Sequence, residues 1–322
     1  MMNPKWMLVT FAAASLVCAS GFAAEIYPVR PIRVLAGGAA GGPIDIMGRL
    51  IGQKLSERLG QPVVIDNRGG AGGTIATRMV AQSAPDGYTL LCNSSQFPVA
   101  FSLYKNPGYD PFKDFAPIIN AGVSPNILFV HPSLPVNNLQ ELLALGRTTK
   151  LTYGSPSMGS TPHLTGERLL RTMAHLDITT VPFNGAANAM NAVIAGQLRL
   201  GVIAMPPTVP FIKAGKLRGI AVTSSQRMAQ LREVATVAES GFPGYEDYTW
   251  IGFFAPAGTS RVLVDKLNRD IAAIEHLPDT STRLEAIGFD PISNTPEEFT
   301  KYVKTEVVKW AKVIKDSGAH VD

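Results

Sequence analysis

The stretch Ile32-Arg-Val-Leu-Ala-Gly-Gly-Ala-Ala-Gly-Gly-Pro-Ile44 predicts an apolar strand, a loop of small residues and the first turn of a helix. Pro43 has the fixed φ that suits the first helical position, and apolar residues then recur at helical spacing up to Leu59. Gly60 is suited to end the helix in a left-handed conformation. A strand followed by a helix in this way is the repeating unit of a layered α/β fold.

A faint echo of this unit occurs later, although the similarity is too weak to be a sequence repeat. The stretch Leu151-Thr-Tyr-Gly-Ser-Pro-Ser-Met-Gly-Ser-Thr-Pro-His163 again predicts a strand, a loop rich in small residues and a helix that starts at a proline. One such unit in each of two lobes would place two helix amino termini opposite each other across a cleft.

Apolar strand-like runs alternate with helical patterns along most of the chain, which predicts α/β layers with a mostly parallel sheet. The expected strands are Ile32–Ala36, Val63–Asp66, Thr89–Asn93, Ile127–Val130, Leu151–Gly154, Thr179–Phe183, Leu200–Met205, Gly219–Thr223 and Tyr248–Ala255. The expected helices are Ile44–Leu59, Thr74–Ser83, Leu139–Leu145, Pro162–Met173, Ala186–Ala195, Val262–Glu275, Ser281–Ile287 and Pro296–Ser317.

The last helical segment is too short to fold alone, so we expect it to pack back on the first lobe. Residues 25–126 and 252–322 would then form lobe 1, and residues 127–251 would form lobe 2, joined by two crossings of the chain. A length of 322 residues agrees with about two domains.

The composition excludes several classes of protein. Hydrophobic residues make up 46% and charged residues 17% of the chain, which excludes a disordered or collagenous protein. The formal net charge is +4, but we find no Lys/Arg cluster that could follow a phosphate backbone. We therefore expect no nucleic-acid partner.

Residues 1–24 resemble a cleavable secretory signal: Lys5 is followed by an apolar run and then by Gly21-Phe22-Ala23-Ala24. The alternative is an uncleaved membrane anchor, which the alanine-rich run and the small residues before Glu25 disfavour. Val17 stands where a lipidation signal before Cys18 would need a small residue. We predict an exported, periplasmic protein whose signal is removed.

Cys92 is then the single thiol of the mature chain, so no intrachain disulfide can form. It lies in the apolar run Tyr88-Thr-Leu-Leu-Cys-Asn93, which favours a buried small hydrophobic residue over a reactive thiol.

The first loop, Gly37–Pro43, suits an anion because its small residues allow close approach to backbone N–H groups at a helix amino terminus. It lacks the Lys and Ser/Thr of a Walker loop, since Gly42 is followed by Pro43. The loop Arg68–Thr74 lacks the third glycine of a dinucleotide fingerprint. Either loop could also be a tight turn without a ligand. Asp45 could cap the helix or touch a ligand.

The second loop, Gly154–His163, offers serine hydroxyls and backbone donors ahead of a helix that Thr161 could cap. Ser157 lacks the flanking glycine pair of a nucleophile elbow, because Ser155 occupies one of the two positions. The scattered histidines show no zinc spacing, so we expect no metal, no cofactor and no catalytic residue.

Several further segments, taken in their order and spacing, resemble one known family, the Bug-type extracytoplasmic solute receptors of tripartite tricarboxylate transporters. The resemblance covers essentially the whole mature chain. It is carried by Tyr27-Pro-Val-Arg-Pro-Ile-Arg33, Gly41-Gly-Pro-Ile-Asp45, Leu59-Gly-Gln-Pro-Val-Val64, Asn67-Arg-Gly-Gly-Ala-Gly-Gly73, Pro85-Asp-Gly-Tyr-Thr-Leu-Leu91, Lys213-Ala-Gly-Lys-Leu-Arg218, Ala238-Glu-Ser-Gly-Phe-Pro-Gly244 and Ala255-Pro-Ala-Gly258.

The resemblance implies a two-lobed, type II periplasmic-binding-protein fold that closes on a small carboxylate-bearing solute, without catalysis. It further implies membrane permease components as partners, and we expect a monomer. Asn184, in the Phe183-Asn-Gly185 stretch where the family often has Tyr-Lys-Gly, is a candidate hydrogen-bonding residue. The full set of candidate ligand-binding residues is Gly38, Ala39, Ala40, Gly41, Gly42, Asp45, Ser94, Ser95, Ser155, Ser157, Gly159, Ser160, Thr161, Asn184 and Gly185.

Two positions depart from the family pattern. Gly37-Gly38 stands where members commonly have Pro-Phe, so we hypothesise a wider pocket or an altered loop. Arg199 stands where members commonly have Asp; it would favour an extra negative charge if it faced the ligand and would mean little if it faced solvent. The alternative functions are a ligand-sensing subunit for a signalling partner and an enzyme on the same fold.

Overall fold

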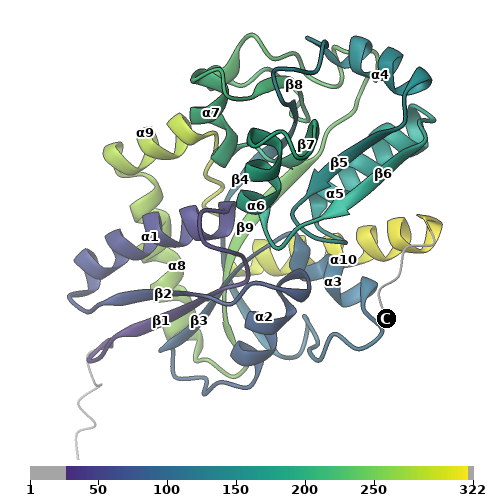
Figure 1. Cartoon of the computed structure of the whole chain (residues 1–322). Coiled ribbons are helices and arrows are strands. Elements are labelled where there is room, and N and C mark those ends of the chain that lie inside the picture. The colour runs from purple at the N-terminus through teal and green to yellow at the C-terminus, as the bar shows by residue number, and fades with distance from the viewer. Residues whose placement is uncertain (1–26, 318–322) are drawn as a thin grey trace, which may run out of the picture.

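A computed structural model of the chain describes residues 27–317, so the predicted signal segment 1–24 lies outside the described residues. The chain forms two α/β lobes, one above the other in Figure 1. The strands are β1 (Ile32–Ala36), β2 (Val63–Asn67), β3 (Thr89–Ser94), β4 (Phe115–Val130), β5 (Leu151–Ser155), β6 (Ile178–Pro182), β7 (Leu200–Ala204), β8 (Arg218–Val222) and β9 (Tyr248–Pro256).

Helices cover both faces of the sheet (Figure 1). The α-helices are α1 (Pro43–Leu59), α2 (Thr74–Ala81), α3 (Gln96–Leu103), α4 (Leu139–Thr148), α5 (Thr161–Gly166), α6 (Ala186–Ile194), α7 (Val209–Lys213), α8 (Arg261–Glu275), α9 (Pro278–Ile287) and α10 (Pro296–Ser317). Short 3₁₀ turns lie at η1 (Ala71–Gly73), η3 (Pro206–Thr208) and η4 (Ala229–Leu231), and η2 (Glu167–Met173) is a π-helix that continues α5.

Within the described residues the strands form one nine-stranded sheet in the order β2-β1-β3-β9-β4-β7-β5-β6, with β8 also paired to β4. The pairs β1·β2, β1·β3, β5·β6 and β5·β7 are parallel, as the alternating sequence pattern predicts. The pairs that involve β4 or β9 are antiparallel, because these strands carry the chain between the lobes. The sheet is therefore mixed rather than mostly parallel.

The long strand β4 belongs to both halves of the sheet. Its first part, Phe115–Pro125, pairs with β9, and its last part, Asn126–Val130, pairs with β7 and β8. Two register shifts, between Pro117 and Ile119 and between Asn120 and Gly122, interrupt the pairing with β9. Such bulges bend a strand and increase its twist. They accompany the passage of β4 from one lobe into the other.

Separate apolar cores lie under the two halves of the sheet. In the lower lobe of Figure 1, α1 and α8 bury Met47, Ile51 and Leu267 against β1, β3 and β9. In the upper lobe, β5 and η2 bury Tyr153 and Leu169 in another cluster. Each core stabilises its own lobe by removing apolar surface from water.

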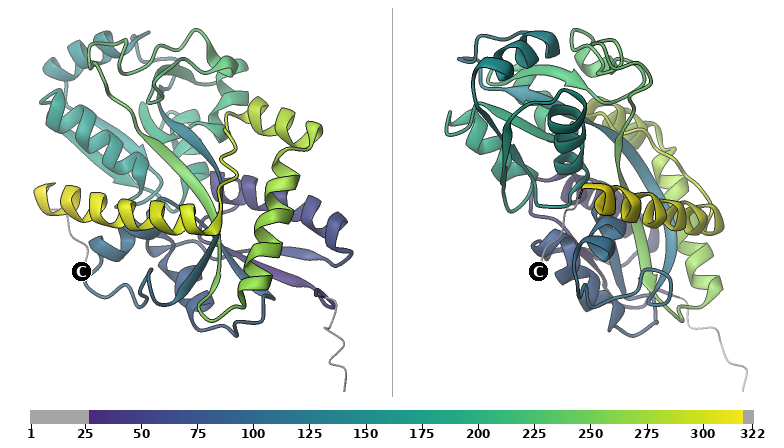
Figure 2. Two further views of the ribbon diagram at one scale, coloured as in Figure 1. Left: turned by 180° about the vertical axis from the view of Figure 1, so that it is seen from behind. Right: turned by 90° about the vertical axis from the view of Figure 1, so that its right-hand side faces the viewer.

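Helix α10 lies across the junction of the lobes, as both views in Figure 2 show. Its residues Phe299 and Val303 pack on Phe254 of β9, within the lower lobe. Nearer its end, Trp310 packs in a small cluster with Leu103 of α3 and Leu164 of α5, which belong to different lobes. The helix therefore contacts both lobes.

One further expectation is wrong in detail, and one helix was not expected. Strand β4 begins at Phe115 instead of Ile127, because Pro117, Asn120 and Gly122 break the apolar pattern at the bulges. Helix α3 is not evident from the sequence, because it is buried on almost all sides and lacks an amphipathic period. No helix within residues 27–317 is long and apolar enough to cross a membrane.

Candidate functional site

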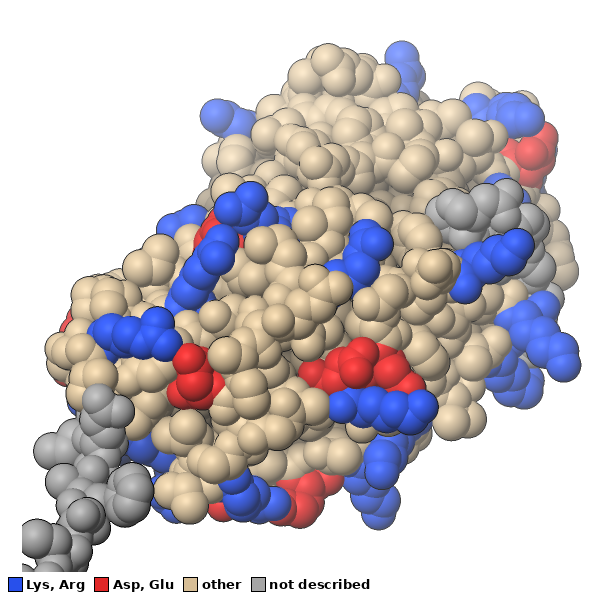
Figure 3. Space-filling model, turned by 90° about the horizontal axis from the view of Figure 1, so that it is seen from below, with Lys and Arg blue, Asp and Glu red and all other residues tan. Residues whose placement is uncertain are grey.

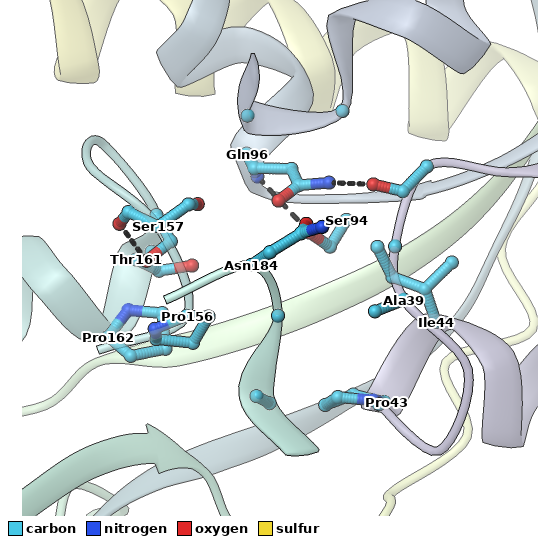
Figure 4. A pocket seen from close by; sticks show the side chains of 18 of the residues that line it. Ala39, Pro43, Ile44, Ser94, Gln96, Pro156, Ser157, Thr161, Pro162 and Asn184 are labelled. Atoms are coloured by element: carbon cyan, nitrogen blue, oxygen red, sulfur yellow. Dashed lines mark hydrogen bonds between the residues drawn. The ribbon is translucent and has the colours of Figure 1, made fainter. Parts of the chain in front are cut away.

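A hollow of about 360 Å³ lies between the two lobes, at the carboxyl ends of the parallel strands (Figure 4). In open α/β sheets this edge is where ligands bind, because loops and helix amino termini converge there. Among the described residues that line the hollow, none is Asp, Glu, Lys, Arg or His. Any charge on a ligand must therefore be stabilised by backbone dipoles and neutral side chains.

The lower lobe contributes three loops to the hollow. The β1–α1 loop supplies Gly38 and Ala39 and the first turn of α1 from Gly42 to Ile44. The β2–α2 loop contributes the small residues Gly70–Gly73, which include the tight 3₁₀ turn η1 and its left-handed glycines. The β3–α3 connection contributes Ser94 and Gln96. Each loop follows a parallel strand and precedes a helix.

The Gln96 side chain ties two of these loops together. Its Nε2 donates to the carbonyl oxygen of Gly37 at 2.6 Å and to Oδ1 of Asn93 at 2.9 Å. Gly37 must lack a side chain, because a Cβ there would lie 2.7 Å from Asn93 Cγ. The first loop is thus held in one shape by contacts to its backbone (Figure 4).

The upper lobe contributes the β5–α5 and β6–α6 loops. Ser157, Ser160 and Thr161 line the hollow from the first of these loops, and Asn184 and Gly185 line it from the second. In Figure 4, Ser157 and Thr161 lie on the side opposite Ala39 and Ile44. The two lobes therefore present different chemistry: mainly backbone on one side and hydroxyl and amide groups on the other.

The structure brings nine of the fifteen predicted site residues to the wall of the hollow: Gly38, Ala39, Gly42, Ser94, Ser157, Ser160, Thr161, Asn184 and Gly185. The other six lie close to the hollow in sequence but are not among its lining residues: Ala40, Gly41, Asp45, Ser95, Ser155 and Gly159.

Asp45 acts as a cap of the first loop. Its Oδ2 accepts a hydrogen bond from the Gly41 N–H at 2.9 Å, and its Oδ1 lies 2.8 Å from Nε of Arg49. Burial opposes ionisation of this carboxyl, but the hydrogen bonds from Arg49 and Gly41 outweigh it and hold its pKa below the usual range. Of the two roles open to Asp45, the geometry favours capping.

Ser95 does not line the hollow but holds Thr161, a residue of its wall, in place. Its Oγ shares a short hydrogen bond with Oγ1 of Thr161, which also accepts one from Thr249 at 3.2 Å. Because Ser95 comes from the lower lobe and Thr161 from the upper lobe, this bond joins the lobes next to the hollow. Ser155 is fully buried at the end of β5, below the wall.

His163 holds the second loop in place. Its Nδ1 accepts a hydrogen bond from the Gly159 N–H at 3.1 Å, so this nitrogen carries no proton. Burial lowers the pKa of His163, and the neighbouring Glu167 only partly opposes this effect. A neutral imidazole engaged with the backbone does not face Ser157 as a general base would, which agrees with the binding interpretation of the loop.

Several residues that line the hollow are absent from the set expected from the sequence: Gly70, Ala71, Gly72, Gly73, Gln96, Tyr104, Pro156, Met158, Phe183 and Thr249. The glycine-rich turn after β2 fails the dinucleotide fingerprint, yet it still belongs to the site. One signal could have found it, because every loop that follows a parallel strand reaches the same edge of the sheet. That rule would have included Gly70–Gly73.

The two lobes meet at the rim of the hollow. Gly185 has a left-handed φ of 98°, and a Cβ added there would lie 2.6 Å from the Cβ of Ala39 in the opposite lobe. A Cβ on Gly159 would collide with the Leu103 side chain of α3. Glycine at these two positions lets the lobes approach closely.

Of the two departures from the family pattern, one faces the site. A Cβ on Gly38 would point at Ile44, 3.1 Å from its Cδ1, and both residues line the hollow. Arg199 does not line the hollow. Its position therefore favours the second interpretation, in which it has little influence on ligand binding.

Two α/β lobes, crossings through shared central strands and a hollow at the strand ends between the lobes define a solute-binding protein of the type II periplasmic class. Solved structures of periplasmic transport and binding proteins match this fold, and the predicted fold class is confirmed. The chain belongs to the family of tripartite tricarboxylate transporter receptors, whose family model matches residues 47–319. The predicted resemblance to Bug-type receptors is likewise confirmed.

Curated relatives and solved structures extend over almost the whole chain. Protein BugT of Bordetella pertussis is 34% identical over 306 residues, which are 94% of this chain and 93% of the relative. The periplasmic binding protein BugD is 35% identical with a TM-score of 0.87, covering 91% of this chain and 99% of that one.

Two similar structures contain a ligand. An R. palustris protein solved with adipate is 36% identical with a TM-score of 0.88, covering 92% of this chain and 100% of that one. MatC of Rhodopseudomonas palustris, solved with malate, is 32% identical with a TM-score of 0.83, covering 89% and 100%. Both ligands are small dicarboxylates.

Proposed function

We propose that this protein captures a small carboxylate-bearing solute between its lobes in the periplasm and delivers it to the membrane components of a tripartite transporter. The observation that carries the proposal is the hollow itself, which is lined by helix amino termini and neutral donors and by no charged side chain among the described residues. Its family membership and the adipate and malate complexes of its neighbours support the same ligand chemistry.

The lower lobe would bind one carboxylate through backbone N–H groups. The first turn of α1, at Gly42–Ile44, faces the hollow, and the N–H groups of a first helical turn have no intrahelical acceptor. These donors and the helix dipole stabilise an anion without a counter-ion. Glycine and alanine in the preceding loop leave room for the ligand to reach them.

The upper lobe would hold the ligand through side chains. The Asn184 amide and the Ser157 hydroxyl line the hollow, and neither makes a side-chain hydrogen bond to another described residue. Both are therefore available to a ligand. The remaining wall includes Ile44, Met158 and Phe183, which can contact the carbon skeleton of the solute.

Lobe boundaries and the state of the protein in the cell form part of the proposal. We keep residues 25–126 with 252–322 as lobe 1 and residues 127–251 as lobe 2, because β4 and β9 carry the chain between the lobes. We further propose cleavage of residues 1–24, a periplasmic location, action as a monomer and no catalytic activity.

A thermal-shift screen tests ligand capture. Purified protein is heated with adipate, malate, citrate and larger aromatic carboxylates, with adipamide as an uncharged control of matched shape. A ligand present at 100 times its Kd stabilises the folded state by about 2.7 kcal/mol, so at least one acid should raise the unfolding temperature and adipamide should not. No stabilisation by any acid, or chemical turnover of a stabilising compound, would contradict the receptor function.

Uptake measurements test delivery. Cells that lack the gene should lose uptake of the stabilising acid, and the wild-type gene should restore it. If uptake persists without the receptor while the purified protein still binds the acid, then the binding part of the proposal stands and the transport part fails.

A further inference from the structure

The hydroxyl groups of Ser95 and Thr161 meet where the two lobes touch beside the hollow. Ser95 belongs to the lower lobe and is 0% exposed, and Thr161 belongs to the upper lobe and is 1% exposed. Their oxygens share one short hydrogen bond, in which either oxygen can act as the donor. Each hydroxyl carries one proton, so this pair has two protons and a single bond between them. One of the two protons needs another acceptor.

The neighbouring groups decide which proton is left over. Within residues 27–317 the Ser95 hydroxyl makes no other hydrogen bond, so its proton is available only to Thr161. Thr161 also accepts a hydrogen bond from Oγ1 of Thr249 at 3.2 Å. A hydroxyl oxygen has two lone pairs, and Ser95 and Thr249 then occupy both of those on Thr161. The proton of Thr161 is therefore the one without an acceptor.

The hollow is the place where an acceptor for this proton can bind. Thr161 lines the hollow, whereas Ser95 does not (Figure 4). The opposite arrangement, with Thr161 donating to Ser95, would leave the Ser95 proton unpaired in the interior, where no ligand can reach it. A buried donor without an acceptor costs free energy, and an oxygen atom of a ligand in the hollow would remove that cost. A bound acid thus favours the arrangement in which Thr161 donates into the hollow.

Charged side chains do not line this wall. Figure 3 shows Lys, Arg, Asp and Glu residues spread over the face of the molecule seen from below, while none of the described residues that line the hollow is charged. An acid bound in the hollow therefore depends on neutral donors. A hydroxyl that already accepts two hydrogen bonds is polarised by them, which makes it a stronger donor.

We propose that Ser95 is a positioning residue, which occupies the oxygen of Thr161 and so directs the Thr161 proton at a carboxylate oxygen of the bound acid. This inference rests on the proposed function, the capture of a carboxylate between the lobes. Because Ser95 and Thr161 belong to different lobes, the donor is oriented only when the lobes are together. The closed form then binds the acid more tightly than an open form, and such a ligand shifts the protein toward closure.

Isothermal titration of Ser95→Ala tests the proposal. The ligands are adipate, malate and citrate, and each acid is compared with its amide. Without Ser95, the oxygen of Thr161 can accept a hydrogen bond from an amide as well as donate to an acid. We expect the Kd of the acids that bind to rise at least tenfold, and the Kd of their amides to stay within about threefold of the wild-type value. The preference for the acid over its amide should shrink accordingly.

Three further variants serve as controls. Ser240→Ala removes a hydroxyl that is 4% exposed, lies outside the hollow and donates to the Thr236 carbonyl oxygen at 2.8 Å, so it should keep the wild-type preference. Thr161→Val should lose the preference as Ser95→Ala does. Thr161→Ser, which keeps the hydroxyl, should restore most of what Thr161→Val loses. Circular dichroism confirms that each variant is folded.

The ratio of the two Kd values separates proton positioning from simple support of closure. If Ser95 only held the lobes together, its loss would weaken the binding of acid and amide alike, so an unchanged ratio would overturn the proposal. An unchanged acid affinity in Ser95→Ala would also overturn it. Both results leave the capture of an acid intact. If the wild-type protein binds no acid, the proposed function fails and this inference fails with it.

Discussion

The β1–α1 loop of the lower lobe and the β5–α5 loop of the upper lobe occupy equivalent places, yet they are stabilised in different ways. The first loop has no side-chain cap at Gly42 and is fixed through its backbone, by Asp45 accepting from Gly41 and by Gln96 donating to Gly37. Its own side chains are almost absent. It can therefore present N–H groups to a ligand at close range.

The second loop is fixed by its own side chains. Ser160 caps α5 by accepting from the His163 N–H at 3.4 Å, and the imidazole of His163 accepts from Gly159. The Ser157 hydroxyl of this loop lines the hollow and makes no side-chain hydrogen bond to another described residue. One lobe thus supplies fixed dipoles and the other supplies adaptable hydrogen-bonding groups, a division that can hold a carboxylate at one end and allow the rest of the ligand to vary.

The contact between the lobes offers the strongest test of this division. Gly185→Ala would place a methyl group 2.6 Å from the Cβ of Ala39, so the lobes could not approach as closely. If both loops must hold the ligand together, its affinity should fall by about ten- to hundredfold. Isothermal titration with the acid identified by the thermal-shift screen measures the change.

Gly241→Ala is the matched control for this variant. Gly241 has the same φ of 98°, but a Cβ there has nothing within 4 Å. Both substitutions impose a similar backbone strain, so only the close approach of the lobes differs. Equal affinities of the two variants would show that the ligand does not need both loops.

The space beside Gly38 in the first loop should determine which acids fit into the hollow. In Gly38→Phe the new side chain starts 3.1 Å from Ile44 Cδ1, so Ile44 or the ring must enter the hollow. We expect about a tenfold loss of affinity for bulky aromatic acids and little change for malonate. A selectivity profile identical to that of the wild type would contradict the assignment of Gly38 to the pocket wall.

As the pH falls, the second loop should lose stability before the first loop does. Burial lowers the pKa of His163, so the unfolded chain takes up the proton more readily than the folded protein. The stability that neutral His163 contributes is complete above its unfolded pKa of about 6.5 and is lost as the pH falls below it. Asp45, whose pKa lies below the usual range, stays charged in that window.

His163→Asn tests this difference, because Asn can accept from the Gly159 N–H but cannot titrate. Chemical denaturation at pH 7.5 and pH 5.0 should show a smaller loss of stability in the variant than in the wild type. Asp247, with a pKa raised to about 6 mainly by burial, titrates in both proteins and cancels from the comparison. The same pH dependence in both would refute the role given to His163.

The smallest change in ligand affinity is expected when the single Asn184 amide is removed. Asn184→Ala removes one side-chain hydrogen bond to the ligand, a change worth about threefold in Kd. Asn191→Ala, on the exposed side of α6 and outside the hollow, serves as the control. If Asn184→Ala binds every acid as the wild type does, the amide makes no contact with the ligand.

The repeating strands and helices are predictable because their apolar residues recur with a clear period. The predicted strand Ile32–Ala36 has the observed bounds of β1, and Gly60 ends α1 with a φ of 67°, as its position indicates. Strand β4 and helix α3 are harder to predict, since bulges and burial on all sides remove the periodic pattern.

The site is predictable where a loop combines small residues with a helix start, as at Gly38–Gly42 and Ser157–Thr161. It is not predictable where the contribution depends on distant partners. Ser95 is bound by Thr161 of the other lobe, a contact that spacing cannot reveal, whereas the pair of Asp45 with Arg49 has the i,i+4 spacing of the predicted helix and could have been deduced. Gln96 enters the site only because the unpredicted helix α3 begins there.

The burial of Cys92 makes the protein convenient for measuring lobe motion. This thiol is fully buried in the core of the lower lobe, and burial raises its pKa, so it is slow to react with maleimide reagents. Cysteines introduced at the exposed positions Ala40 of the lower lobe and Asn188 of the upper lobe could therefore be labelled with a donor and an acceptor dye while Cys92 stays in place. Energy transfer between the dyes would test whether the lobes move relative to each other when a ligand binds.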